Sequence, residues 1–225
     1  MGLTVTQVAA SMASCGTPVD PELVLAWERG SHVPSDQHLF ALADVLWCDT
    51  VTLMGTGPRT LVEFRLARRL GVEGLAHRLG MEPSEYRAAE SARQWHGDAR
   101  QTRVLVEALG LSLRKLTGIV GRDGELEDHL RSAIAGRWKV HVDPVVEIVA
   151  VDATSVGDAL RTMHGEFSEF SEFSERYMGN LVARNDDSRL KEIAAERAAY
   201  LRRLADRFWE LVGEEGGAQT LGLDG

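Results

Sequence analysis

Residues 71–92 read GVEGLAHRLGMEPSEYRAAESA, and this stretch predicts two short helices joined by a tight turn. Leu75 and Leu79 recur at the spacing of one helical face. Gly80 is typical of a helix end, because glycine adopts the left-handed conformation there at little steric cost. Pro83 suits the first turn of the next helix, where its missing N–H would have no partner in any case. The sequence therefore predicts a helix, a three-residue turn and a second helix.

Signals on both sides of this stretch predict further short helices. Residues 61–70 carry apolar side chains at helical spacing and form the helix that precedes it. Asp98 followed by Gln101 resembles a capping box, in which two side chains satisfy the free backbone donors at the start of a helix. Ser112 is placed to cap one more short helix. Residues 58–121 are thus expected to form five helices.

A related pattern occurs in residues 1–57, so the first half of the chain contains an internal repeat. The offset between equivalent residues is 67 at Ala9 and Ala76, before the turn, but 62 at Glu28 and Glu90, after it. The first copy therefore carries five extra residues between these two points.

The two copies share matching features, which are Ala9 and Ala76, Trp27-Glu28 and Ala89-Glu90, and Leu42, Leu46, Leu53 and Gly55 with their counterparts Leu105, Leu109, Leu116 and Gly118; the first copy also has Pro34-Ser35. With these residues both copies resemble the Xre/Cro/C1-type helix-turn-helix domain, a compact five-helix fold of phage-repressor type, over residues 3–120. The resemblance implies a DNA-binding transcriptional regulator whose third helix enters the major groove of double-stranded DNA. The first copy would lack the family's first helix, so that either other residues complete its core or the true start of the chain lies upstream.

The sequence departs from the family where the family touches DNA. Val5 and Val72 occupy the position at which the family usually has a phosphate-binding Gln. The expected base-facing surfaces also carry carboxylates, which accept from cytosine N4 but repel phosphates. These surfaces are Asp20, Pro21, Glu22, Leu25 and Ala26 in the first copy, and Glu82, Pro83, Ser84, Glu85, Arg87 and Ala88 in the second.

The charge distribution favours the second copy as the DNA contact. The chain carries a net charge of −9, divided into −4 over residues 1–60, +2 over 61–125 and −7 over 126–225. The alternative is an ordinary solvated helix surface on which Glu90 pairs with Arg93 or Arg87. The residues expected to bind DNA are Ser84, Arg87, Arg78, Arg93, Arg100 and Arg103.

A second functional hypothesis is a protein-interaction scaffold or adaptor, built on degenerate helix-turn-helix units that bind another protein such as a transcription component. The acidic third-helix surfaces and the missing Gln favour it. Trp27 and Trp47 are expected to fill the protein core, since large aromatic side chains near helix ends usually do so.

Residues 122–154 are expected to connect the two halves, beginning with a helix over 126–136. Trp138, Val140 and Val142 then alternate with polar residues, which is typical of a strand and predicts a short β-hairpin within 137–151. The dipeptide Asp143-Pro144 is equally compatible with the start of a helix.

Residues 155–213 are expected to form an antiparallel helical hairpin, with its apolar stripes packed together. A triplet repeat places Phe167, Phe170 and Phe173 on one broad helical face, which either packs within the hairpin or contacts a second copy or a protein partner. The Gly-rich tail, 214–225, is expected to be frayed. The apolar residues of the stripes are Leu160, Met163, Phe167, Phe170, Tyr177 and Leu181, and then Leu190, Ile193, Ala194, Leu201, Leu204, Phe208 and Leu211.

The sequence thus predicts a mainly α-helical chain with tandem phage-repressor-like units followed by a helical hairpin. Phosphate loops, nucleophile elbows and metal-ligand clusters are absent from the sequence, so we expect no enzymatic activity, cofactor or metal. Of the histidines, His141 and His164 alone merit inspection as ligands. Cys15 and Cys48 lie far apart and predict no disulfide. The sequence has no signal peptide or membrane-spanning segment, which favours the cytoplasm.

Overall fold

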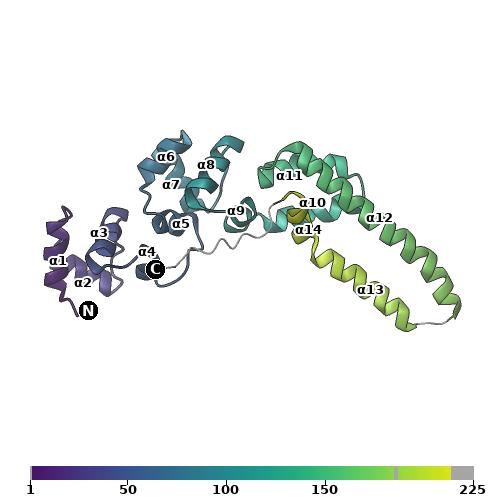
Figure 1. Cartoon of the computed structure of the whole chain (residues 1–225), viewed down its shortest axis with the longest axis horizontal. Helices are drawn as coiled ribbons and strands as arrows, with labels where there is room; N and C mark the ends of the chain where they lie inside the picture. Colours follow the sequence, from purple (N-terminus) through teal and green to yellow (C-terminus); the bar gives the residue numbers. More distant parts are fainter. Residues whose placement is uncertain (1, 185–186, 214–225) are drawn as a thin grey trace. The chain divides into compact units, whose positions relative to one another are not determined.

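The computed structural model describes residues 2–184 and 187–213, and these residues form helices and no β-strand (Figure 1). The prediction of a mainly helical chain is confirmed. The contacts divide the chain into two compact units, Met1–Trp95 and His96–Gly225. The boundary between the two units lies inside the segment 58–121 defined by the repeat.

The first unit contains seven helices in its described residues. Most begin at a residue whose side chain accepts a backbone N–H in the first turn, as at Thr4, Asp20, Ser35, Asp49 and Thr60. The helices are α1 (Val5–Ser14), α2 (Pro21–Glu28), α3 (Asp36–Leu46), α4 (Thr50–Met54), α5 (Leu61–Ala67), α6 (Val72–Leu79) and α7 (Pro83–Ala92).

The first copy of the repeat buries a core of its own between α1, α2 and α3. Met12 is completely buried at its centre. The residues that line this core are Val8, Ala9, Met12, Val24, Ala41 and Val45.

The five extra residues of the first copy are distributed between a helix and a turn. Helix α1 has 10 residues and its counterpart α6 has 8. The connection from α1 to α2 spans residues 15–20, whereas that from α6 to α7 spans only 80–82. The insertion therefore lengthens one helix by two residues and one loop by three.

The second unit is built around a larger apolar core. Its elements are α8 (Ala99–Leu109), α9 (Leu113–Ile119), α10 (Asp123–Ala135), a 3-10 helix η1 (Trp138–His141), α11 (Val142–Val149), α12 (Ala153–Arg184), α13 (Asp187–Arg202) and α14 (Leu204–Leu211). Leu130 on α10, Leu160 on α12 and Phe208 on α14 are completely buried in this core. Trp209 is buried there as well, although it lies outside the apolar stripe that the sequence indicated.

The β-hairpin predicted within 137–151 is wrong, because the chain forms η1 and α11 there. Pro144 lies in the first turn of α11, where a helix tolerates proline. Val145, Ile148 and Val149 then face the core at the spacing of a helix. No strand pairs with the alternating residues 138–142 in the described part of the chain. The apolar residues after Pro144 recur at helical spacing, and this segment is therefore a helix.

The predicted helical hairpin is present in 155–213: α12 runs out from the body of the second unit and α13 returns along it (Figure 1). Helix α14 then packs on α10 and α12. Met163 and Phe167 are buried as predicted, and Phe170 is half-buried. The side chains of Phe173, Tyr177, Leu181, Leu190 and Ile193, and the tail 214–225, lie outside the described residues.

No helix within the described ranges combines the length and the apolar character needed to cross a bilayer.

Candidate nucleic-acid interface

Helices α6 and α7 and the three residues between them hold the candidate site in a defined geometry. Gly80 ends α6 in the left-handed conformation, with φ 69°, and its N–H donates toward the carbonyl groups of Ala76 and His77. Pro83 opens α7, and the Glu85 carboxylate accepts the Glu82 N–H at 3.4 Å. The predicted turn of 80–82 is therefore confirmed.

Helix α7 has one buried face and one exposed face. Tyr86 and Glu90, four residues apart, are buried. Ser84 and Arg87, three residues apart, are exposed on the other side of the helix. Two of the predicted DNA-binding side chains thus share the solvent face of α7.

Arg87 forms an ion pair with Glu73 at the start of α6. Their side chains are 54% and 69% exposed, so that water screens the attraction. Such a pair contributes little to stability, and a phosphate group can replace the carboxylate at small cost. The alternative prediction that Glu90 pairs with Arg87 or Arg93 is wrong, because Glu90 is buried and pairs with Arg65.

Arg78 and Arg93 are exposed at the ends of α6 and α7. Arg93 ends α7 in the left-handed conformation, with φ 54°. No ion pair of either guanidinium with another described residue is present. Both groups are therefore available to an external anion.

Arg100 and Arg103 belong to the second unit, on α8. Their spacing of three places them on one face of the helix, and both are exposed. As with Arg78 and Arg93, neither forms an ion pair within the described ranges. The Asp98 carboxylate caps this helix by accepting the Gln101 N–H at 2.7 Å, as the sequence predicted.

The position of the family's phosphate-binding Gln is unsuited to that role here. Val72 is only 6% exposed and belongs to the buried face of α6. Val5, its counterpart on α1, is half-buried and packs on the core of the first copy. An anion bound at α6 must therefore rely on other side chains.

The corresponding surface of the first copy is acidic. Asp20 caps α2 by accepting the Glu22 N–H at 2.9 Å, and both side chains are exposed. Glu28 at the end of α2 is exposed too, and no ion pair joins it to a described residue. This surface repels phosphate.

The two tryptophans of the first copy have different environments. Trp27 is half-buried, packs on the core of the first copy and contacts His38, with ring centroids 5.1 Å apart and ring planes inclined by 44°. The prediction that Trp47 fills the core is wrong, because its side chain is 88% exposed. Trp47 ends α3 in the left-handed conformation, so that its side chain leaves the helix where the chain turns.

A buried ion pair that the sequence analysis missed holds α7 against α5. Arg65 and Glu90 form two parallel hydrogen bonds, Nε to Oε1 at 2.7 Å and Nη2 to Oε2 at 3.1 Å. The Nη1 group of Arg65 also donates to Asp36 of α3 at 2.5 Å. Burial alone would lower the pKa of Arg65, but Glu90 and Asp36 raise it, so the group remains charged. Burial also raises the pKa of Tyr86, and the charge of Glu90 adds to this effect.

Further contacts join the first copy of the repeat to the second. Arg69, just after α5, binds both carboxylate oxygens of Asp44 on α3 at 2.6 and 2.7 Å. Its guanidinium also lies over the Phe40 ring, and the Thr50 hydroxyl donates to the Leu66 carbonyl at 2.8 Å. The spacing of four between Arg65 and Arg69, and between Asp36, Phe40 and Asp44, is the signal that sequence reasoning could have used.

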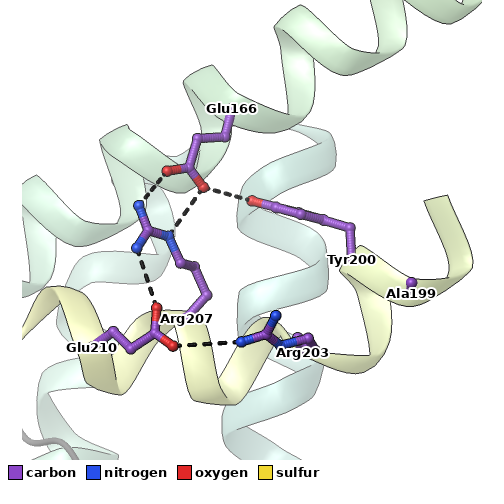
Figure 2. A pocket seen from close by; sticks show the side chains of 6 residues that line it. All are labelled: Glu166, Ala199, Tyr200, Arg203, Arg207 and Glu210. Carbon is purple, nitrogen blue, oxygen red and sulfur yellow. Dashed lines mark hydrogen bonds and ion pairs between the residues drawn. The ribbon is translucent and has the colours of Figure 1, made fainter. Parts of the chain in front are cut away.

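A pocket of about 450 Å³ lies between α12, α13 and α14 in the second unit (Figure 2). Arg207 bridges Glu166, with Nη2 to Oε1 at 2.5 Å, and Glu210, with Nη1 to Oε2 at 3.2 Å. The Tyr200 hydroxyl donates toward Glu166 at 3.3 Å, and Arg203 lies 3.7 Å from Glu210. Both arginines are thus matched by carboxylates inside the pocket, which indicates a network that fastens α14 to the hairpin.

Of the two histidines singled out from the sequence, His164 has a structural role. Its Nδ1 lies 3.0 Å from the Ile134 carbonyl and donates to it. His141 instead contacts His129, which the sequence analysis did not single out.

No protein-family model, curated protein or solved structure was found to match this chain.

Proposed function

We propose that the chain is a DNA-binding transcriptional regulator of Xre/Cro/C1 type, with the second repeat copy as its main contact to double-stranded DNA. The observation that carries the proposal is the exposure of four arginines, Arg78, Arg93, Arg100 and Arg103. These four are exposed and form no ion pair within the described residues. Unpaired guanidinium groups bind phosphate without first releasing a carboxylate.

The local geometry supports α7 as the helix that meets the bases. It follows α6 after a turn of three residues, and its first turns present Ser84 and Arg87 to solvent. In helix-turn-helix proteins the N-terminal part of the second helix contacts base edges, while surrounding side chains hold the phosphates. Ser84 and Arg87 are then the base-facing candidates, and Glu82 and Glu85 restrict binding to bases that donate a hydrogen bond.

The net charge of the chain limits its affinity for DNA. The whole chain is acidic, with a net charge of −9, and its basic excess of +2 lies in residues 61–125. Binding to arbitrary duplexes is therefore weak, and it weakens further as the salt concentration rises. The C-terminal helices supply the contact between two copies in this proposal, since dimers of such units read paired half-sites.

A protein-interaction scaffold is the second candidate. The exposure of Trp47 supports it, because tryptophan is enriched in the energetic centres of protein interfaces. The exposed carboxylates of Asp20, Glu22 and Glu28 add an acidic surface suited to a basic partner. On this second proposal, the first copy binds protein and DNA binding is absent.

The test is fluorescence anisotropy with a labelled pool of random-sequence duplexes at low salt. One variant carries Arg78→Ala, Arg87→Ala and Arg93→Ala, and a second carries Arg100→Ala and Arg103→Ala. A matched control replaces Arg131, Arg137 and Arg161, which are exposed on other parts of the chain. The control removes the same number of charges as the first variant.

The proposal expects binding by the wild type and the control, and at least tenfold weaker binding by the triple variant. Equal loss in the control would show that only net charge matters. No binding by the wild type at low salt would remove the DNA-binding function and favour the scaffold.

A further inference from the structure

His129 and His141 come together in the second unit, although twelve residues separate them in the sequence. His129 lies on α10, and His141 is the last residue of η1. Their Nδ1 atoms are 3.2 Å apart, and the ring planes are inclined by 60° with centroids 5.5 Å apart. The two imidazole rings therefore meet head-on through equivalent nitrogen atoms.

This separation matches the distance between two nitrogens bound to one metal ion. Zinc–imidazole bonds are about 2.0–2.1 Å long, so two ligands at a tetrahedral angle lie about 3.3 Å apart. In the metal-free pair, one Nδ1–H donates to the other Nδ1. Metal binding requires that this proton move from Nδ1 to Nε2 of the same ring, so that both Nδ1 lone pairs are free. Each ring must also turn by about 35° so that the two lone pairs meet at one ion.

The surroundings of the pair include one nearby carboxylate. Glu125, one turn before His129 on α10, contributes negative charge, although its carboxylate pairs with Arg122 at 2.8 Å. Both histidines are half-buried, so that water reaches the open side of the site.

We propose that His129 and His141 chelate one divalent transition-metal ion through their Nδ1 atoms, with water in the remaining coordination positions. Imidazole suits Zn²⁺, Cu²⁺ and Ni²⁺. Within the described residues, no group of three or more His, Cys, Asp or Glu side chains is placed to hold a metal. The site is therefore an open, two-ligand site.

The consequence for the fold follows from the two elements that the ligands join. Helix α10 and η1 pack on one another, and α10 carries Leu126, Leu130 and Ile134 of the core. A metal ion held by one ligand from each element fixes η1 on α10. Binding to the folded state alone raises the thermal stability of the chain.

The test is isothermal titration of the tag-free, EDTA-treated full chain with ZnCl₂. The variants are His129→Ala and His141→Ala, each alone. The control carries His32→Ala and His77→Ala, two exposed histidines of the first unit. Thermal melts of every variant in EDTA check the fold without metal.

The expected result is one bound equivalent in the wild type and the control, its loss in each site variant, and tighter binding of Cu²⁺ than of Zn²⁺. Long-range ¹H–¹⁵N NMR of the wild type gives a second readout that needs no variant. The Nδ1 resonances of His129 and His141 shift together with one equivalent of Zn²⁺. Unchanged Nδ1 resonances, or unchanged binding in either site variant, would overturn the proposal.

Discussion

Arg65 on α5 and Glu90 on α7 form a buried, bidentate ion pair within the second repeat copy, with their side chains 3% and 5% exposed. Breaking such a pair leaves a charge in the interior without its partner, which costs far more than the loss of a surface ion pair. The pair also fixes α7, because Glu90 lies on its buried face opposite Ser84 and Arg87. The orientation of the candidate DNA-binding helix thus depends on a contact that touches no DNA.

We expect Arg65→Met to destabilise the chain by about 3–5 kcal/mol, because Glu90 is left buried and unpaired. Urea denaturation followed by circular dichroism measures the change. The control is Arg87→Ala, which removes the exposed pair with Glu73 and is expected to cost less than about 1 kcal/mol. Equal stability of the two variants would show that the Arg65–Glu90 pair has no special role.

Asp44 provides a prediction about pH. The hydrogen bonds from Arg69 lower the pKa of Asp44, so the carboxylate stabilises the folded state above its ordinary pKa, and this contribution is lost as the pH falls through the lowered value. In Arg69→Gln, NMR titration should find the pKa of Asp44 raised toward the ordinary value. Asp49 is the internal control, since Thr52 lowers its pKa and Arg69 does not. A pKa of Asp44 that stays low in the variant would rule out this cause.

Trp47 adopts the left-handed conformation with φ 52° while its side chain is 88% exposed. The left-handed conformation costs a residue with a Cβ about 1–2 kcal/mol, whereas glycine adopts it without this cost. Trp47→Gly should therefore stabilise the chain by about 1 kcal/mol in thermal or urea unfolding. Trp47→Ala keeps the strain and should change stability little. Destabilisation by glycine would mean that the indole makes contacts that matter.

Glu73 competes with DNA for Arg87 if the proposed interface is correct. Glu73→Gln releases the guanidinium and should tighten duplex binding by about two- to fivefold, the range expected for an exposed ion pair. The matched control is Glu127→Gln, which releases Arg131 on α10 by the same chemical change. Anisotropy titrations at one salt concentration compare the two. Equal tightening in both variants would point to net charge alone.

Local signals in the sequence predicted the helix boundaries of the repeat well. Gly80 marks the end of α6, Pro83 marks the start of α7, and Asp98 with Gln101 forms the capping box that opens α8. These signals work because the interacting groups are at most a few residues apart. The same reasoning failed at 137–151, where a short apolar alternation is compatible with a strand and with a helix.

Local signals of this kind do not predict contacts between residues that lie far apart in the sequence. Helical spacing predicted Glu90 as a surface residue that pairs with Arg87 or Arg93, whereas the fold buries it against Arg65, twenty-five residues earlier. The pairing of His129 with His141 depends in the same way on how η1 packs against α10. The exposure of Ser84, Arg78, Arg87, Arg93, Arg100 and Arg103 agrees with their predicted role, but their binding to DNA stays a prediction.

The salt dependence of duplex binding tests the central claim, that the arginines of the second copy contact phosphates. The measurement is the slope of log Kd against log salt concentration for the wild type, for the triple variant Arg78→Ala, Arg87→Ala and Arg93→Ala, and for the triple variant Arg131→Ala, Arg137→Ala and Arg161→Ala. In this account Arg78 and Arg93 contact phosphates and Arg87 faces the bases. Each phosphate contact contributes about 0.9 to the slope, so the first variant should lose about 1.8 and the second nothing. Equal slopes in all three proteins would contradict the account.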